Sequence, residues 1–164
     1  YMGTNKKCVM VSIDAATAST GYTIWHNAEI AEQDRFFYDK QKYKDHTQYM
    51  RETLLGFLDR IKPDIIVIED VPFKKNIKTY KLLQRTIATV ETWAMMHDTT
   101  FWEFTPSQWH SLVKDAGEKV PRKREELKQW SIGKTGISQD DISDSQLIGL
   151  AYINMCRAEE KRSA

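Results

Sequence analysis

The chain has 164 residues, of which 41% are hydrophobic and 29% are charged, and its formal net charge is only +1. This length suits one domain with its own core, so we expect residues 1–164 to form a single domain. The composition excludes collagen-like, repetitive and disordered proteins. We also expect no membrane partner and no leader segment, and hence a cytoplasmic protein, because the apolar runs are too short.

The first third of the chain is predicted to form three strands and one helix. Residues 8–14 are apolar and β-branched, residues 21–25 follow a turn of small residues, and residues 29–37 alternate imperfectly between polar and apolar. Short connections between successive strands favour an antiparallel meander. Apolar side chains at steps of three and four then predict a helix over residues 43–61, which Pro63 terminates.

The rest of the chain alternates between predicted strands and helices. Residues 64–69 form a continuous apolar run ending in an acid, which is typical of a central strand covered on both faces. A helix, a strand and three further helices are predicted in turn over residues 76–97, 100–104, 106–114, 121–130 and 139–158. This order predicts an α/β fold with a five-stranded mixed sheet flanked by helices. A sugar-kinase-like half domain begins with the same pattern and is the main alternative.

Four acidic residues stand where separate elements could bring them to one site. Asp14 and Glu69 each end an apolar strand, and Asp141 and Asp144 lie three apart at the start of the last helix. Hard oxygen ligands of this kind suit Mg²⁺ and Mn²⁺, and two such ions can promote phosphodiester hydrolysis. An Asp at a strand end is often a turn residue, whereas a charge that follows four apolar residues, as Glu69 does, is costly to bury unpaired.

Basic residues cluster in two runs despite the small net charge. The first run contains Lys74, Lys75, Lys78, Lys81 and Arg85, and the second contains Lys119, Arg122, Lys123, Arg124 and Lys128. Steps of four, three and four place most of the first run on one helix face. Either run alone could be a solvated helix surface. Two runs on either side of an acidic site favour contacts with the phosphates of a nucleic acid.

Three motifs in the chain resemble those of the RuvC Holliday junction resolvases, especially the divergent forms of lactococcal phages. They cover residues 13–22, with Asp14; residues 68–76, with Glu69; and residues 141–147. The resemblance implies an RNase H-like fold, a homodimer and paired nicking of opposed strands at a four-way DNA junction. It also implies two Mg²⁺ ions per active site, with Mn²⁺ possible, and no organic cofactor. A phage-encoded form would act in the cytoplasm of its host.

The resemblance also assigns residues to roles. The catalytic metal ligands would be Asp14, Glu69, Asp141 and Asp144, and the helix after Glu69 would contact both the partner subunit and DNA. The family's junction-wedging aromatic corresponds to Pro72, so we expect Phe73, one residue later, to contact the junction. Two lysines of the family fall near His110 and among residues 122–124. We favour Lys123 as the basic residue beside the scissile phosphate.

Other functions remain open at this level. An RNA–DNA hybrid nuclease of the same fold class would cut linear hybrids and act as a monomer. A non-catalytic DNA-binding relative would have no activity to lose on Glu69→Gln substitution. A phosphotransferase of the sugar-kinase type is weaker, because no Gly-rich phosphate loop follows the first strand.

Four further side chains are expected to be buried. Cys8 and Cys156 lie far apart in apolar contexts, which favours two reduced thiols in the core over a disulfide. Trp93 and Trp102 are expected in the core as well, because large aromatic side chains bury more area there than on a surface.

Overall fold

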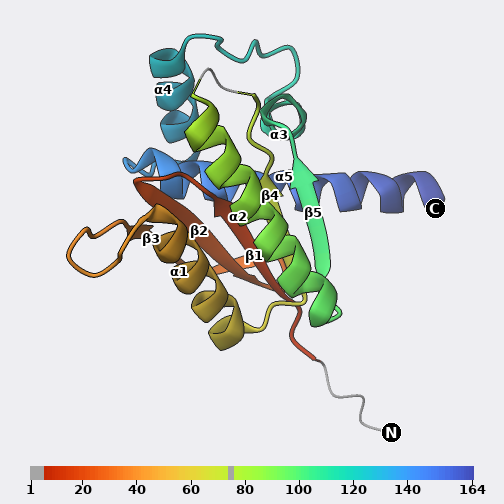
Figure 1. The fold of residues 1–164 in the computed structure, drawn as a ribbon. Coiled ribbons are helices and arrows are strands. Elements are labelled where there is room, and N and C mark those ends of the chain that lie inside the picture. Colours follow the sequence, from red (N-terminus) through yellow and green to blue (C-terminus); the bar gives the residue numbers. More distant parts are fainter. Residues whose placement is uncertain (1–5, 74–75) are drawn as a thin grey trace, which may run out of the picture.

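The computed structural model describes residues 6–73 and 76–164, which contain one five-stranded sheet of order β3-β2-β1-β4-β5 (Figure 1). Its strands are β1 Val9–Asp14, β2 Ser19–His26, β3 Glu29–Phe37, β4 Ile65–Glu69 and β5 Thr100–Phe104. β2 pairs antiparallel with β1 and β3, whereas β4 pairs parallel with β1 and β5. The predicted mixed sheet is therefore confirmed.

Helices cover both faces of this sheet (Figure 1). α1 (His46–Ile61) and α2 (Ile77–Met96) lie on one face, and α5 (Asp140–Ser163) crosses the other, where α3 (Pro106–Val113) and α4 (Arg124–Thr135) pack against it. α4 begins and ends later than predicted, and Gly136, with φ of 75°, terminates it in the left-handed conformation that favours glycine. Among the described residues, no helix is both long and apolar enough to span a membrane.

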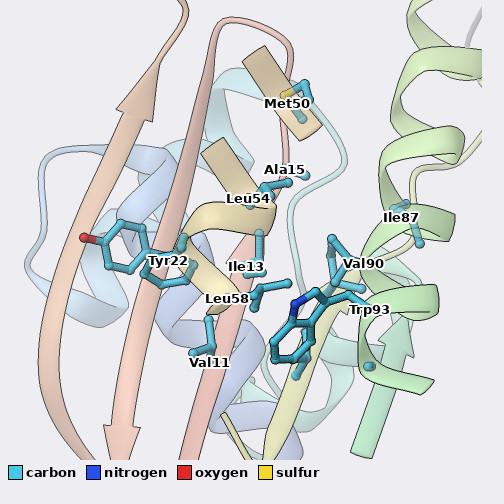
Figure 2. Close-up of a cluster of buried hydrophobic side chains, with 14 of the residues drawn as sticks. Val11, Ile13, Ala15, Tyr22, Met50, Leu54, Leu58, Ile87, Val90 and Trp93 are labelled. Carbon is cyan, nitrogen blue, oxygen red and sulfur yellow. The ribbon is translucent and has the colours of Figure 1, made fainter. Parts of the chain in front are cut away.

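The alternation of side chains along β1 and β4 determines where the acidic strand ends point. Val11 and Ile13 are fully buried against α1 and α2, and Figure 2 shows them in one cluster with Leu58 and Val90. Successive side chains on a strand point to opposite faces. The side chain of Asp14 therefore lies on the α5 face of the sheet. Glu69 lies there too by the same argument, because Val67, two residues earlier, packs in the α5 core.

A buried polar network fixes α5 on the sheet. The Ser12 hydroxyl donates to the carbonyl oxygen of Ser145 at 2.6 Å, and the Thr23 and Ser145 hydroxyl oxygens are 2.8 Å apart. The Trp25 indole donates to Ser12 at 2.9 Å. A Cβ atom at Gly149 would collide with Ser12 and Trp25, so only glycine allows the helix to approach this closely. These contacts set the position of the acidic first turn of α5 relative to β1 and β2.

Three of the four burial predictions were wrong. Cys8 is exposed and Cys156 is half-buried, although both are free thiols as expected. Trp102 is 41% exposed because β5 is an edge strand with little cover. Trp93 is buried beneath α2, as predicted.

Candidate active site

A cavity of about 820 Å³ opens where β1 and β4 end and α5 begins. Its wall includes all four predicted carboxylates, Asp14, Glu69, Asp141 and Asp144. β1 and β4 run parallel, with Ile13 level with Ile68, so the next residues, Asp14 and Glu69, leave the sheet side by side. Residues that are far apart in the sequence therefore face one cavity.

The electrostatics of this cavity favour a cation. Burial, and then the negative charges of Glu69 and Asp144, raise the pKa of Asp14 well above its ordinary value. Burial also raises the pKa of Asp144 to about 6. Neighbouring carboxylates in a desolvated site cannot all ionise without mutual repulsion. A cation bound among them would relieve this repulsion and stabilise the ionised forms.

Two of the carboxylates accept hydrogen bonds from buried donors on α3 and α4. The Trp109 indole N–H, on α3, donates to Oε2 of Glu69 at 2.5 Å. The Ser131 hydroxyl, on α4, donates to Oδ1 of Asp144, also at 2.5 Å. Both donor residues are 2% exposed, and their acceptors line the cavity, so these bonds are part-buried. Bonds to a charged acceptor in such surroundings restrain its orientation.

Asp141 is engaged on both of its carboxylate oxygens. The Ser19 hydroxyl donates to Oδ2 at 2.7 Å, and Nη1 of Arg35 lies 3.4 Å from Oδ1. The Arg35 guanidinium also stacks 4.5 Å above the ring of Phe37. A Cβ at Gly21 would collide with the backbone carbonyl of Asp141, so this glycine permits close contact between β2 and α5. Neither Ser19 nor Arg35 was predicted from the sequence as a site residue.

The carboxylate groups of these residues are of the chemical type that binds a divalent cation, but their present positions are too far apart to hold one. Carboxylate oxygens are the ligands that Mg²⁺ and Mn²⁺ prefer, and four of them face one cavity. Across residues 6–73 and 76–164, however, no three Asp, Glu, His or Cys side chains are grouped closely enough to hold a metal ion. Glu69, Asp141 and Asp144 are instead bonded to protein donors. Metal binding would require side-chain rearrangement.

Comparison with known proteins identifies relatives in sequence, although no family model matches the chain. The crossover junction endodeoxyribonuclease RuvC of Trichlorobacter lovleyi is 24% identical over 150 residues, covering 88% of this chain and 84% of that protein. The RuvC of Caldicellulosiruptor saccharolyticus is 20% identical over 151 residues, covering 88% of this chain and 91% of that protein.

Solved structures agree with this likeness. RuvC of T. thermophilus, determined in complex with a Holliday junction substrate, superposes with a TM-score of 0.66 at 16% identity, covering 92% of this chain and 96% of that one. The yeast mitochondrial Holliday junction resolvase Ydc2 gives 0.56 at 14% identity, covering 90% and 79%. The chain is RuvC-like. The predicted RNase H-like fold is thereby confirmed, whereas the likeness to phage forms stays a prediction.

The basic residues of α4 that line the cavity of this RuvC-like chain differ from the one we favoured. Arg124 and Lys128, both on α4, line the cavity, and Nζ of Lys128 lies 3.9 Å from Asp140. Lys123 does not line it; its side chain is 83% exposed and pairs with Glu126 at 3.5 Å. The sequence predicted a basic side chain from residues 122–124 near the carboxylates. Which of these side chains faces the cavity depends on where α4 begins.

His110, which the sequence resemblance had aligned with a lysine, does not supply a cation. Its ring packs against Trp109 and Trp130, with ring centroids 4.0 and 5.5 Å away. Burial lowers the pKa of His110 to about 4, so the ring is neutral at neutral pH. His110 lines a separate hollow of about 680 Å³, which also brings Lys119 and Arg122 together.

The first basic run flanks the acidic cavity of the RuvC-like chain. Three of its members are exposed on α2: Lys78, Lys81 and Arg85. Lys74 and Lys75 lie outside the described residues. Thr79 and Leu83, on the same helix, line the cavity, so α2 borders the acidic site directly. Phe73, just before this helix, is 75% exposed.

Proposed function

We propose that this chain is a divalent-metal-dependent endonuclease that resolves four-way DNA junctions by paired nicks. Residues 1–164 would act as one nuclease domain. The observation that carries the proposal is the convergence of four carboxylates, from β1, β4 and α5, on one cavity of a RuvC-like fold. The names of the relatives and the junction-bound RuvC structure support this choice of substrate.

Six charged residues of the cavity have a role in this proposal. Mg²⁺ or Mn²⁺ ions, two per site, would be held by Asp14, Glu69, Asp141 and Asp144, and would supply an acidified water and charge compensation at the leaving 3′-oxygen. Arg124 and Lys128 face the same cavity and would neutralise the charge that develops on the scissile phosphate. They are better placed for this than Lys123.

The surroundings of the cavity would bind the DNA arms. Exposed Lys78, Lys81 and Arg85 would contact phosphates along α2, as would Lys119 and Arg122 on the second hollow. Phe73 is exposed enough to contact bases at the branch point. One active site makes one nick, so paired nicks on opposed strands require a homodimer with two sites.

The test is cleavage of branched and linear substrates by the purified protein. Four-way, three-way and linear DNA and a linear RNA–DNA hybrid are incubated with Mg²⁺ or with a chelator, and the nicks are mapped. We expect symmetrical nicks on opposed strands of the four-way junction, only with Mg²⁺, and none with the Glu69→Gln variant. Preferred cutting of the linear hybrid would indicate a hybrid nuclease. Junction binding without any cutting would indicate a non-catalytic relative.

A further inference from the structure

Trp109 presents a buried hydrogen-bond donor directly to one of the cavity carboxylates. Its indole nitrogen lies 2.5 Å from Oε2 of Glu69, and its side chain is 2% exposed. A buried indole N–H needs an acceptor, since leaving it unpaired costs free energy. Here the acceptor is a carboxylate facing the acidic cavity rather than a backbone carbonyl of the core.

The Trp109 indole is anchored by its helix and by core packing. Trp109 lies in the first part of α3, whose start is fixed by reciprocal hydrogen bonds between Thr105 and Gln108. Its ring packs in the α5 core with Phe104 and Leu147. A donor held by both helix geometry and core packing restrains its acceptor strongly.

We propose that Trp109 is a positioning residue, which orients the carboxylate of Glu69 for divalent-cation binding. The inference rests on the proposed function, because it assumes that Glu69 is a metal ligand. A hydrogen bond to one carboxylate oxygen limits rotation of the group and so reduces the conformational entropy lost when a cation binds. Partners that hold a metal ligand typically contribute about 10- to 100-fold in metal affinity or activity.

The chain contains a matched control for this role. The Trp130 indole also donates to a glutamate, Oε1 of Glu118, at 2.8 Å. Trp130 packs beside Trp109 in the same core region, with ring centroids 6.5 Å apart. Glu118 lines other hollows, not the cavity of the four predicted ligands. Trp109→Phe and Trp130→Phe each remove one indole N–H and a similar volume, but only the first removes a bond to Glu69.

The first measurement is the affinity of the full chain for Mn²⁺ alone, by calorimetry without DNA. We expect Trp109→Phe to weaken binding by about 10- to 100-fold and Trp130→Phe to leave it unchanged. Thermal unfolding of both variants shows whether they fold equally well. Equal Mn²⁺ affinity for Trp109→Phe and the unsubstituted chain would overturn the proposal.

A second measurement reports on the position of the indole itself. Each of the five tryptophans gives one indole resonance in a ¹⁵N–¹H NMR spectrum, and the two variants assign those of Trp109 and Trp130. Paramagnetic Mn²⁺ broadens resonances close to it. The Trp109 resonance should therefore vanish at lower Mn²⁺ concentration than that of Trp130, and the reverse order would contradict the proposal.

Glu69→Gln separates failure of this inference from failure of the proposed function. If Glu69→Gln abolishes both Mn²⁺ binding and nicking while Trp109→Phe changes neither, Glu69 is a ligand that does not depend on Trp109. If Glu69→Gln leaves Mn²⁺ binding and nicking intact, the nuclease site and the role of Trp109 are both wrong.

Discussion

The hydroxyl group of Ser131 donates a 2.5 Å hydrogen bond to the carboxylate of Asp144. Ser131 is buried on α4, and this bond opposes the burial that raises the pKa of Asp144 to about 6. Two consecutive helices, α4 and α5, therefore determine together the charge state of one predicted metal ligand.

Replacing Ser131 by Ala should shift the pH dependence of nicking upward. Ionised Asp144 is the form that binds a cation, and the hydroxyl favours that form, so its loss raises the pKa of Asp144 further. Nicking at a fixed pH near 6 should fall by about 10- to 100-fold. Cleavage rates measured across pH test this. Ser111→Ala, at an exposed serine of α3, is the control, and equal profiles for the two variants would contradict the assignment.

The metal-free protein should lose stability as the pH rises. A carboxyl whose pKa is higher in the folded than in the unfolded state favours folding when protonated. The contribution of Asp144 is thus complete below its ordinary pKa of 3.8 and is lost as the pH rises through about 6. Thermal unfolding in a chelator should show this decline, and Asp144→Asn should reduce it. Added Mg²⁺ should restore stability at neutral pH only with Asp144 present.

Gly21→Ala should disturb the start of α5. The new Cβ would collide with the carbonyl oxygen of Asp141, and such overpacking costs about 1–3 kcal/mol in the free energy of unfolding. Denaturant unfolding measures this cost, and nicking should fall as Asp141 moves. Gly56→Ala, in α1 with open space around it, should stabilise the protein by roughly 0.5–1 kcal/mol. Equal behaviour of the two variants would mean that α5 lies farther from β2.

Reversing the charges of Lys78 and Lys81 to Glu should weaken junction binding for all sequences alike. Phosphate contacts carry no base information, and losing two of them should lower the slope of log affinity against log salt by about 2. Binding titrations over a range of salt concentrations test this. The control is the same reversal at Lys161 and Arg162, in the exposed last turn of α5. An equal loss in both variants would show only a net-charge effect.

Much of the fold was predictable because each element carries its own periodicity. The apolar run of Ile65–Glu69 and the helical spacing of residues 43–61 both indicated the elements that the structure contains. α4 was placed too early because Pro121 resembles a helix start, yet Lys123 is still extended and the helix begins at Arg124. The charged stretch between them has no apolar period to fix a boundary.

The acidic residues of the site could be predicted from the sequence, but the residues that bond to them could not. Asp14 and Glu69 were identifiable because a charge at the end of an apolar strand is conspicuous. Arg35 was not, since 106 positions separate it from Asp141 and only the packing of β3 beside α5 joins them. Ser131 and Trp109 are ordinary helix residues in the sequence, and only the folded chain brings their donors to carboxylates.

Whether the four carboxylates bind metal is tested by a crystal structure of the protein grown with Mn²⁺, with anomalous scattering used to locate the ions. We predict anomalous density in the cavity, with Asp14, Glu69 and Asp144 as ligands and with Oε2 of Glu69 still bonded to the Trp109 indole. Crystals of the Asp14→Asn variant grown in the same way should lack this anomalous density. Full Mn²⁺ occupancy elsewhere, with this cavity empty, would show that these carboxylates do not form the metal site.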